Sequence, residues 1–286
     1  MLPKKLRAKQ VTDFRPIANL RLLYKVFAYL LLGRLEHVLD AQQPEEQHGF
    51  RAGRRLEEHL LSANILLDKA QATGFPVWII SLDLSKAFDR VHWPALWAAL
   101  LEQGVSEHLI WILQRVYYGQ HGEIVGNFGQ SDQFPITGGV RQGCVLSPRL
   151  FCAVLEFAMR KWRHAVGQAG IDLMDGGPNL LDLRFADDII ICARSRHELG
   201  QLVDSLTIHL EQVGLLLNAD KTVVLTNEAQ PPPILATDGG LKLAILQRNV
   251  GQKWLGCMLA AEGSQSQHID LEYHLQQASK SFYANR

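Results

Sequence analysis

The chain has 286 residues, and its 29 Lys and Arg residues balance 29 Asp and Glu residues, so the formal net charge is zero. A chain of this length has room for one large domain or two small ones, each with a real core. The neutral total argues against a protein that is basic over its whole surface, but it is compatible with a basic groove on one face.

The N-terminus and the cysteines indicate an intracellular protein. The basic segment 1–7 is not followed by an apolar segment, so no secretory signal peptide is indicated. The most apolar stretch, 22–32, contains a lysine and is too short to span a bilayer. The four cysteines form no Cys-x-x-Cys pair and lie in apolar segments, which predicts reduced and mostly buried thiols. We therefore expect a nuclear or cytoplasmic protein that is not secreted and makes no membrane contact.

In chain order, hydrophobic periodicity predicts helices that alternate with short strands. Helices are expected at 20–39, 56–72, 94–101, 106–118, 147–163, 195–213 and 268–286. A buried strand is expected at 77–83, hairpins at 123–135, 180–193 and 249–259, and a turn followed by a strand at 215–226. The stretch 229–240 contains three consecutive prolines and is predicted to be a loop.

The chain is organised around Phe185-Ala186-Asp187-Asp188, which lies between two apolar runs that are typical of strands. Neighbouring carboxylates repel each other and raise each other's pKa unless a cation neutralises them. A divalent metal site and a solvated Asp-Asp turn are both compatible with this local pattern.

Asp83 is the first candidate partner of this acidic pair. It ends the predicted strand 77–83, and strand ends are usual positions for functional residues in α/β sheets. If both strands share a sheet, three carboxylates converge at one edge, where they could hold two Mg²⁺ ions for phosphoryl transfer. Taken alone, Asp83 could equally cap the turn that follows it.

The glycine-rich loop 138–143 is a weaker candidate for substrate binding. Its glycines allow a close approach of backbone to a substrate, Arg141 could pair with a phosphate, and Gln142 could touch a nucleotide. The loop lacks the G-x-x-x-x-G-K-[ST] spacing of a P-loop. Phe88, five residues after Asp83, is either a core residue or a ring that lies against a sugar.

Basic residues elsewhere could contact phosphates, although solvated surface side chains explain each of them equally well. These residues are Arg15, the cluster of Arg51, Arg54 and Arg55, and Lys221.

Seven segments in this order resemble the reverse transcriptases, and most closely those of non-LTR (LINE-like) retrotransposons. The segments are D-F-R-P-I-A-N-L (13–20), Q-H-G-F-R-A-G-R (47–54), S-L-D-L-S-K-A-F-D-R-V (81–91), G-V-R-Q-G-C-V-L-S-P-R-L-F (139–151), F-A-D-D (185–188), G-L-L-L-N-A-D-K-T (214–222) and K-W-L-G (253–256). The succession of seven segments is far more specific than any one of them.

The resemblance implies an α+β fold of the right-hand polymerase kind, with an antiparallel palm sheet backed by helices. It implies fingers at 1–76 with part of 105–135, a palm at 77–262, and a helical tail at 263–286 in place of a thumb, which is missing, vestigial or only begun there. Residues 1–262 would form a single reverse transcriptase domain.

The resemblance also implies a role for individual residues. The catalytic residues would be Asp83, Asp187, Asp188 and Lys221, of which the three acids are also the metal ligands and the lysine lies near the leaving group. The nucleotide-binding residues would be Arg15, Phe88, Gln142 and Gly143, with Phe88 screening the 2′ side of the sugar. The nucleic-acid-binding residues would be Arg51, Arg54, Arg141, Lys253 and Trp254, the last two in the primer grip.

The implied function is an RNA-directed DNA polymerase that adds dNTPs to a primer 3′-hydroxyl by two-metal phosphoryl transfer. Its cofactor would be Mg²⁺, two ions, with Mn²⁺ as an alternative, and its partners an RNA template, a DNA primer and dNTPs, with no protein partner evident. Residues 1–60 hold 11 Lys and Arg against 7 Asp and Glu, so the neutral total hides modestly cationic fingers.

Two departures from the family pattern keep alternatives open. The chain starts inside the first fingers strand and ends in a short helical tail, and it contains no endonuclease segment, which favours a fragment. A truncated, inactive remnant that at most binds nucleic acid is one alternative, and another palm-fold enzyme, such as an RNA-dependent RNA polymerase or a nucleotide cyclase, is a second. The intact acids argue against long decay, and Phe88 with the F-A-D-D tip favours DNA synthesis.

Overall fold

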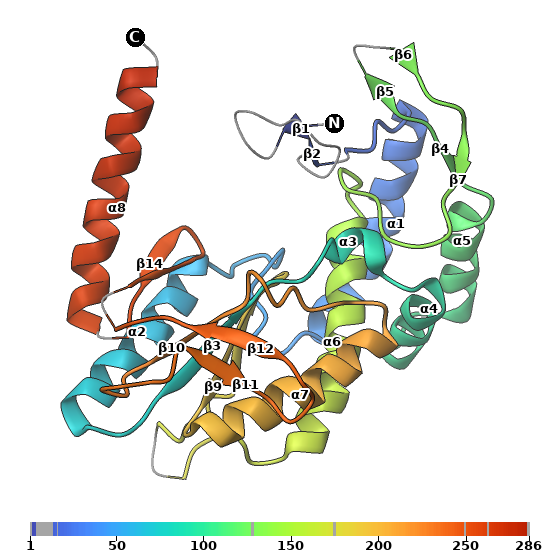
Figure 1. Cartoon of the computed structure of the whole chain (residues 1–286). Coiled ribbons are helices and arrows are strands. Elements are labelled where there is room, and N and C mark those ends of the chain that lie inside the picture. Colours follow the sequence, from blue (N-terminus) through green and yellow to red (C-terminus); the bar gives the residue numbers. More distant parts are fainter. Residues whose placement is uncertain are drawn as a thin grey trace. The chain divides into compact units, whose positions relative to one another are not determined.

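The computed structural model describes residues 2–3, 14–15, 17–126, 129–173, 176–248, 250–261 and 263–284 (Figure 1). The chain forms two compact units, each assembled from separate segments. The first unit comprises 1–43, 86–160 and 210–215, and the second comprises 44–85, 161–209 and 216–286. The division into fingers, palm and tail at the boundaries expected from the sequence remains a prediction.

The first unit is mainly helical. Its helices are α1 (Leu22–Ala41), α3 (Ala87–Arg90), α4 (Trp93–Glu102), α5 (Glu107–Tyr117) and the larger part of α6 (Ser147–Val166). Its short strands pair antiparallel as β1 (Leu2–Pro3) with β2 (Phe14–Arg15), β4 (His121–Gly122) with β7 (Phe134–Pro135), and β5 (Val125–Gly126) with β6 (Gly129–Gln130).

An ion-pair cluster ties α6 to α1 within the first unit. Arg149 is 7% exposed, and its guanidinium lies 2.6 Å from a Glu36 oxygen and 3.1 Å from an Asp40 oxygen. Because one arginine is shared by two carboxylates that are a helical turn apart, the register of the two helices is fixed.

The second unit is built on a six-stranded sheet. Its elements are α2 (Leu56–Thr73), β3 (Trp78–Leu82), β8 (Asp182–Phe185), β9 (Asp188–Ala193), most of α7 (Arg196–Gln212), β10 (Val223–Thr226), β11 (Ile234–Ala236), β12 (Lys242–Ile245), β13 (Gln252–Trp254), β14 (Cys257–Leu259) and α8 (Gly263–Ala284). The strand order is β11-β12-β10-β3-β9-β8, and only the neighbours β10 and β12 run parallel.

Strand β3 lies in the interior of this sheet, and all five of its residues, four of them apolar, are buried. Ile79 packs with Ile190 and Leu225 in the core that α2 covers. Ile80 and its partner Ile191 alternate to the opposite face and are 0% exposed. A sheet buried on both faces fixes the strand register, because a slip of one residue would exchange the faces.

Three local predictions need correction. The stretch expected to be a loop at 229–240 contains β11, an edge strand that gains its partners from β12, a neighbour that short-range pattern does not reveal. Helix α8 begins at Gly263 rather than at residue 268. The hairpin expected at 123–135 is present as two short ladders, but it starts earlier, at His121 in β4, and residues 127–128 lie outside the described residues.

The prediction for the cysteines is consistent with the structure. Cys144, Cys152 and Cys192 are buried and Cys257 is half-buried, all four as free thiols. Among the described helices, none combines the length and the apolar character needed to cross a bilayer.

A buried ion pair supports β8, the strand that leads to the acidic pair. Asp182 and Arg184 are both 0% exposed, with the Arg184 Nε 2.9 Å from an Asp182 oxygen. Arg163 donates to both Asp182 oxygens at 2.8 and 3.0 Å. Removal of one partner from such a cluster leaves an uncompensated buried charge.

We therefore expect Asp182→Ala to lower the free energy of unfolding by about 3–5 kcal/mol, measured by urea denaturation. The matched control is Arg194→Ala, which removes an exposed pair with Glu198 (3.3 Å) and should cost no more than about 1 kcal/mol. Equal costs for the two variants would show that the buried cluster does not hold β8.

Candidate active site

The acidic pair lies at a two-residue turn of the second unit. Phe185 ends β8 and pairs with Asp188, the first residue of β9, so Ala186 and Asp187 form the turn. The hairpin and the position of the acids at its tip are as predicted. Ala186 has a φ of 59°, a left-handed conformation that costs a residue with a Cβ about 1–2 kcal/mol. A strained turn of this kind persists only where its surroundings hold it.

The loop 46–49 is hydrogen-bonded to this turn and to the strand that leads into it. Gln47 is 0% exposed, and its side-chain Oε1 accepts from the backbone N–H of Gly49 (2.8 Å) and of Ala186 (2.9 Å). The backbones are bonded as well, because the His48 N–H donates to the Arg184 carbonyl at 2.9 Å and the Arg184 N–H donates to the Glu46 carbonyl at 2.8 Å. We call this set of contacts the 46–49 clamp.

Gly49 is required by the closeness of the clamp to the turn. A Cβ placed on Gly49 would lie 2.1 Å from the Ala186 backbone nitrogen. The sequence pattern indicates phosphate contacts for the arginines that follow this segment, and it does not reveal the positioning role of the segment itself. The glycine of Q-H-G-F was the available signal, because glycine is favoured where two backbones approach closely.

Two stacked histidines lie beside the clamp. The His48 and His59 ring centroids are 3.7 Å apart, and the His59 Nε2 lies 3.1 Å from the Glu46 carbonyl and 3.0 Å from the Arg184 carbonyl. Burial lowers the pKa of His59 to about 4, so this ring is neutral at pH 7 and its Nε2 donates to these carbonyls. Both rings therefore support the backbone that carries the acids.

Asp83 joins the acidic pair through strand register. Leu82 pairs with Ile189, so the next residue of the chain, Asp83, lies beside Asp188. Asn218 holds it, because the Asn218 Nδ2 donates to the Asp83 Oδ2 at 2.9 Å and the Asn218 N–H donates to the Asp83 carbonyl at 2.8 Å. The predicted convergence of three carboxylates at one end of the sheet is thus present, and Asn218 is a partner that the sequence analysis missed.

Lys221 lies at the same end of the sheet. Its Nζ is 3.7 Å from the Asp83 Oδ2, and its side chain is 69% exposed. An exposed pair at this distance contributes little to stability. The lysine is therefore available to an incoming anion.

The three acids share a strongly negative field. Burial, then the charges of Asp187 and Asp83, raise the pKa of Asp188 from its ordinary 3.8 to about 6. Carboxylate oxygens are the ligands that Mg²⁺ prefers, and a divalent cation would relieve the repulsion that raises this pKa. The donor set therefore fits a divalent metal.

The other predicted residues of the second unit are engaged in contacts of their own. The Arg51 Nη1 donates to the Pro44 carbonyl at 2.7 Å and the Gln47 carbonyl at 3.0 Å, and Arg54 pairs with Glu45 at 2.6 Å. Lys253 is exposed on β13. Trp254 is 2% exposed, so its ring supports this hairpin from the core and is not presented on the surface.

The remaining predicted residues belong to the first unit. The Phe88 ring stacks on Phe151 with centroids 4.8 Å apart, and the Gln142 carbonyl accepts from the Ala18 N–H at 2.8 Å. Gly143 has a φ of 97°, which requires glycine. Arg15 lies in β2, but its side chain is outside the described residues.

Arg141 has internal partners on the glycine loop of the first unit. Its Nε donates to the Gln120 Oε1 at 2.8 Å, its Nη2 donates to the Val116 carbonyl at 3.1 Å, and its guanidinium lies 4.8 Å from the Tyr24 ring centroid and 4.9 Å from that of Tyr117. These contacts favour a structural role over the predicted contact with a phosphate.

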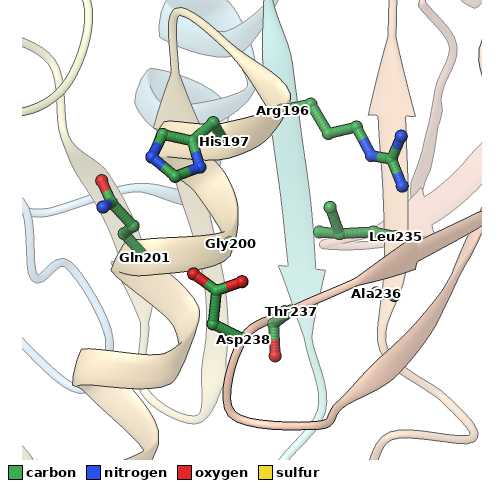
Figure 2. A pocket seen from close by; sticks show the side chains of 8 residues that line it. All are labelled: Arg196, His197, Gly200, Gln201, Leu235, Ala236, Thr237 and Asp238. Atoms are coloured by element: carbon green, nitrogen blue, oxygen red, sulfur yellow. The ribbon is translucent and has the colours of Figure 1, made fainter.

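A hollow of about 290 Å³ lies between the start of α7 and the edge strand β11. Figure 2 shows its lining residues, among them Asp238, with Arg196 of α7 reaching toward Leu235 of β11. In the sheet, β12 and β10 separate β11 from β3, and none of the three acids lines the hollow, so it is not part of the candidate active site.

The family model described as reverse transcriptase (RNA-dependent DNA polymerase) matches residues 2–259. The chain belongs to the reverse transcriptase family. The resemblance that the seven sequence segments carry is thereby confirmed.

Curated relatives are proteins of retrotransposable elements. The chain is 28% identical over 270 residues to the retrovirus-related Pol polyprotein from type-2 retrotransposable element R2DM of Drosophila melanogaster, covering 92% of this chain and 25% of that protein. It is 25% identical over 278 residues to the probable RNA-directed DNA polymerase from transposon X-element of the same organism, covering 91% of this chain and 28% of that protein. This reverse transcriptase chain thus spans about a quarter of the length of these relatives.

Solved structures support the fold. Apo telomerase from Candida tropicalis, truncated from its C-terminal domain, superposes with a TM-score of 0.57 at 17% identity, over 82% of this chain and 44% of that chain. The predicted α+β fold of a right-hand polymerase is therefore confirmed.

The clamp gives a first prediction. We expect Gly49→Ala to lower the free energy of unfolding by about 1–3 kcal/mol, because either the loop 46–49 or the turn that carries Ala186 must move to admit the methyl group. Gly33→Ala is the control, since a Cβ at this position of α1 meets nothing within 4 Å, and it should stabilise the helix by about 0.5–1 kcal/mol. Urea denaturation measures both, and a neutral Gly49→Ala would show that the clamp is not tight.

The field of the acids gives a second prediction. Because the pKa of Asp188 is raised on folding, the folded chain binds a proton that the unfolded chain releases near pH 4, so this carboxyl contributes most to stability at low pH. In the absence of divalent cations, we expect Asp188→Asn to have a higher free energy of unfolding than wild type. This difference should grow as the pH rises from about 4 to about 6. Urea denaturation in EDTA across this range measures the difference, and a constant difference would contradict the raised pKa.

Proposed function

We propose that this chain is the polymerase domain of a non-LTR retrotransposon protein and copies RNA into DNA. The observation that carries the proposal is the convergence of Asp83, Asp187 and Asp188 at one end of the sheet in a chain of the reverse transcriptase family. The reaction is the attack of a primer 3′-hydroxyl on the α-phosphate of a dNTP. A nuclear or cytoplasmic location suits this chemistry.

Asp83 and Asp187 would hold two Mg²⁺ ions, with Mn²⁺ as an alternative, and Asp188 would support them. Bound ions of this kind lower the pKa of an attacking hydroxyl and neutralise a leaving phosphate. The contribution of the protein's other residues is to orient these acids. Asn218 fixes the Asp83 carboxylate, and the 46–49 clamp fixes the turn that carries Asp187.

Lys221 is placed to meet the leaving pyrophosphate. Its Nζ already lies near an Asp83 oxygen but is well exposed, so it can bind an anion without losing a buried contact. Its ammonium group would neutralise the developing negative charge and could donate a proton to it.

The remaining assignments concern the substrate and the nucleic acids. Phe88 would screen the 2′ side of the sugar, and Arg15, Gln142 and Gly143 would contact the incoming nucleotide. Arg54 and Lys253 would contact the RNA template or the DNA primer through phosphates. Arg51, Arg141 and Trp254 would act on nucleic-acid binding indirectly, each within its own unit, since their contacts hold backbone or fill the core.

Primer extension on an RNA template tests the proposal. We expect wild type to incorporate dNTPs only with Mg²⁺ or Mn²⁺, and Asp187→Asn and Asp83→Asn each to lower the rate by at least about 100-fold, because each removes a charge that stabilises the transition state. Asp238→Asn is the control, because this acid lines the hollow between α7 and β11 outside the candidate active site, and it should leave the rate unchanged.

Full extension by Asp187→Asn, with a far-ultraviolet circular dichroism spectrum like that of wild type, would refute the assignment. Binding of RNA by wild type that weakens with salt, without any extension, would leave only a nucleic-acid-binding remnant.

A further inference from the structure

Three potential metal ligands gather in the second unit, on elements that carry none of the acids described above. Cys257 opens β14, and Asp270 and His274 lie on α8. The Cys257 Sγ, a carboxylate oxygen of Asp270 and a ring nitrogen of His274 all lie within 4.8 Å of one another. Among the described residues, this is the one group of three His, Cys, Asp or Glu side chains whose potential ligand atoms all lie this close together.

The local fold brings these three side chains together. Asp270 and His274 are four residues apart on a helix, so they share one face, and the His274 Nε2 lies 3.4 Å from the Asp270 Oδ1. The Met258 N–H donates to the same Asp270 oxygen at 2.7 Å, which joins α8 to β14 next to Cys257. Ser266 of α8 also bonds to the segment that follows β14, because its Oγ accepts from the Ala260 N–H at 2.7 Å.

The spacing is close to that of a tetrahedral metal site. Ligand bonds of about 2.0–2.3 Å place neighbouring donor atoms about 3.3–3.8 Å apart. The pair of His274 and Asp270 already has this separation, and rotation of the exposed His274 side chain can supply the remaining adjustment. The backbone hydrogen bond from Met258 orients the Asp270 carboxylate, as second-shell donors do in metal sites.

We propose that Cys257, Asp270 and His274 bind a transition-metal dication, best matched by Zn²⁺, with water as the fourth ligand. A thiolate, an imidazole and a carboxylate form the mixed set that Zn²⁺ accepts, whereas Mg²⁺ takes oxygen ligands alone. Burial, then the charges of Asp270 and Glu57, raise the pKa of the Cys257 thiol, and a bound cation would offset this by meeting those two charges. The evidence for this site does not depend on the proposed polymerase reaction.

Metal binding would join α8 to the β13–β14 hairpin. This hairpin carries Lys253 and Trp254 on β13, and the Lys253 Nζ lies 5.3 Å from the ring centroid of Tyr273 on α8. A metal that links Cys257 to the same helix would fix the exposed lysine against it. The site would therefore stiffen the hairpin that the sequence segments assign to the primer grip.

Cobalt titration in excess Mg²⁺ tests the site without reference to activity. Co²⁺ bound by a thiolate gives a sulfur-to-cobalt charge-transfer band, and we expect one equivalent that Zn²⁺ displaces. Cys257→Ser should abolish the band, and His274→Ala should weaken Co²⁺ binding by about 10-fold or more. Zn²⁺ should raise the thermal midpoint of wild type but not that of Cys257→Ser.

His268→Ala is the matched control, because it removes the equivalent pair with Glu272 (3.3 Å) on the same helix, where no thiol lies nearby, and it should leave the band unchanged. Asp270→Asn keeps an acceptor for the Met258 N–H, so it tests ligation apart from folding. A chain that shows no band, or a band that survives Cys257→Ser, overturns the proposal, whatever the result of primer extension.

Discussion

The repulsion among Asp83, Asp187 and Asp188 is the constraint on which the site depends. Burial, then the charges of Asp187 and Asp83, raise the pKa of Asp188 to about 6, so the proximity of the three carboxylates is opposed by their own charges. The fold must therefore hold them by contacts that do not involve those charges. It does so through hydrogen bonds of the backbone, because the Ala186 N–H donates to Gln47 and the Asp83 carbonyl accepts from the Asn218 N–H whether the acids are ionised or not.

These contacts reach the acids from two sides. Gln47 accepts from the turn residue Ala186, and Asn218 holds Asp83 through both its side chain and its backbone. The Asp182–Arg184 pair anchors β8 beneath the turn, where both side chains are fully buried. The arrangement is preorganised, so the chain itself bears the electrostatic cost of bringing the acids together.

The chemistry of the site and its location could be predicted from local pattern. A strand that ends in an acid, and a hairpin with two acids at its tip, are visible as short apolar runs with carboxylates at their ends. The assumption that both strands share a sheet then placed Asp83 beside the pair, and the register of β3 and β9 bears this out. Edge strand β11 escaped prediction because its partner β12 supplies its hydrogen bonds.

The sequence by itself determined the family, through seven segments in a fixed order, and the identity of the three acids, because residue type and spacing are local properties of the chain. Only the tertiary structure decided what holds them and which predicted contacts are already used. Gln47 is hydrogen-bonded to a turn that is distant in the sequence, the Arg141 guanidinium is bonded to internal partners, and Trp254 lies in the core. Such facts depend on which distant segments pack together, and no local period encodes that pairing.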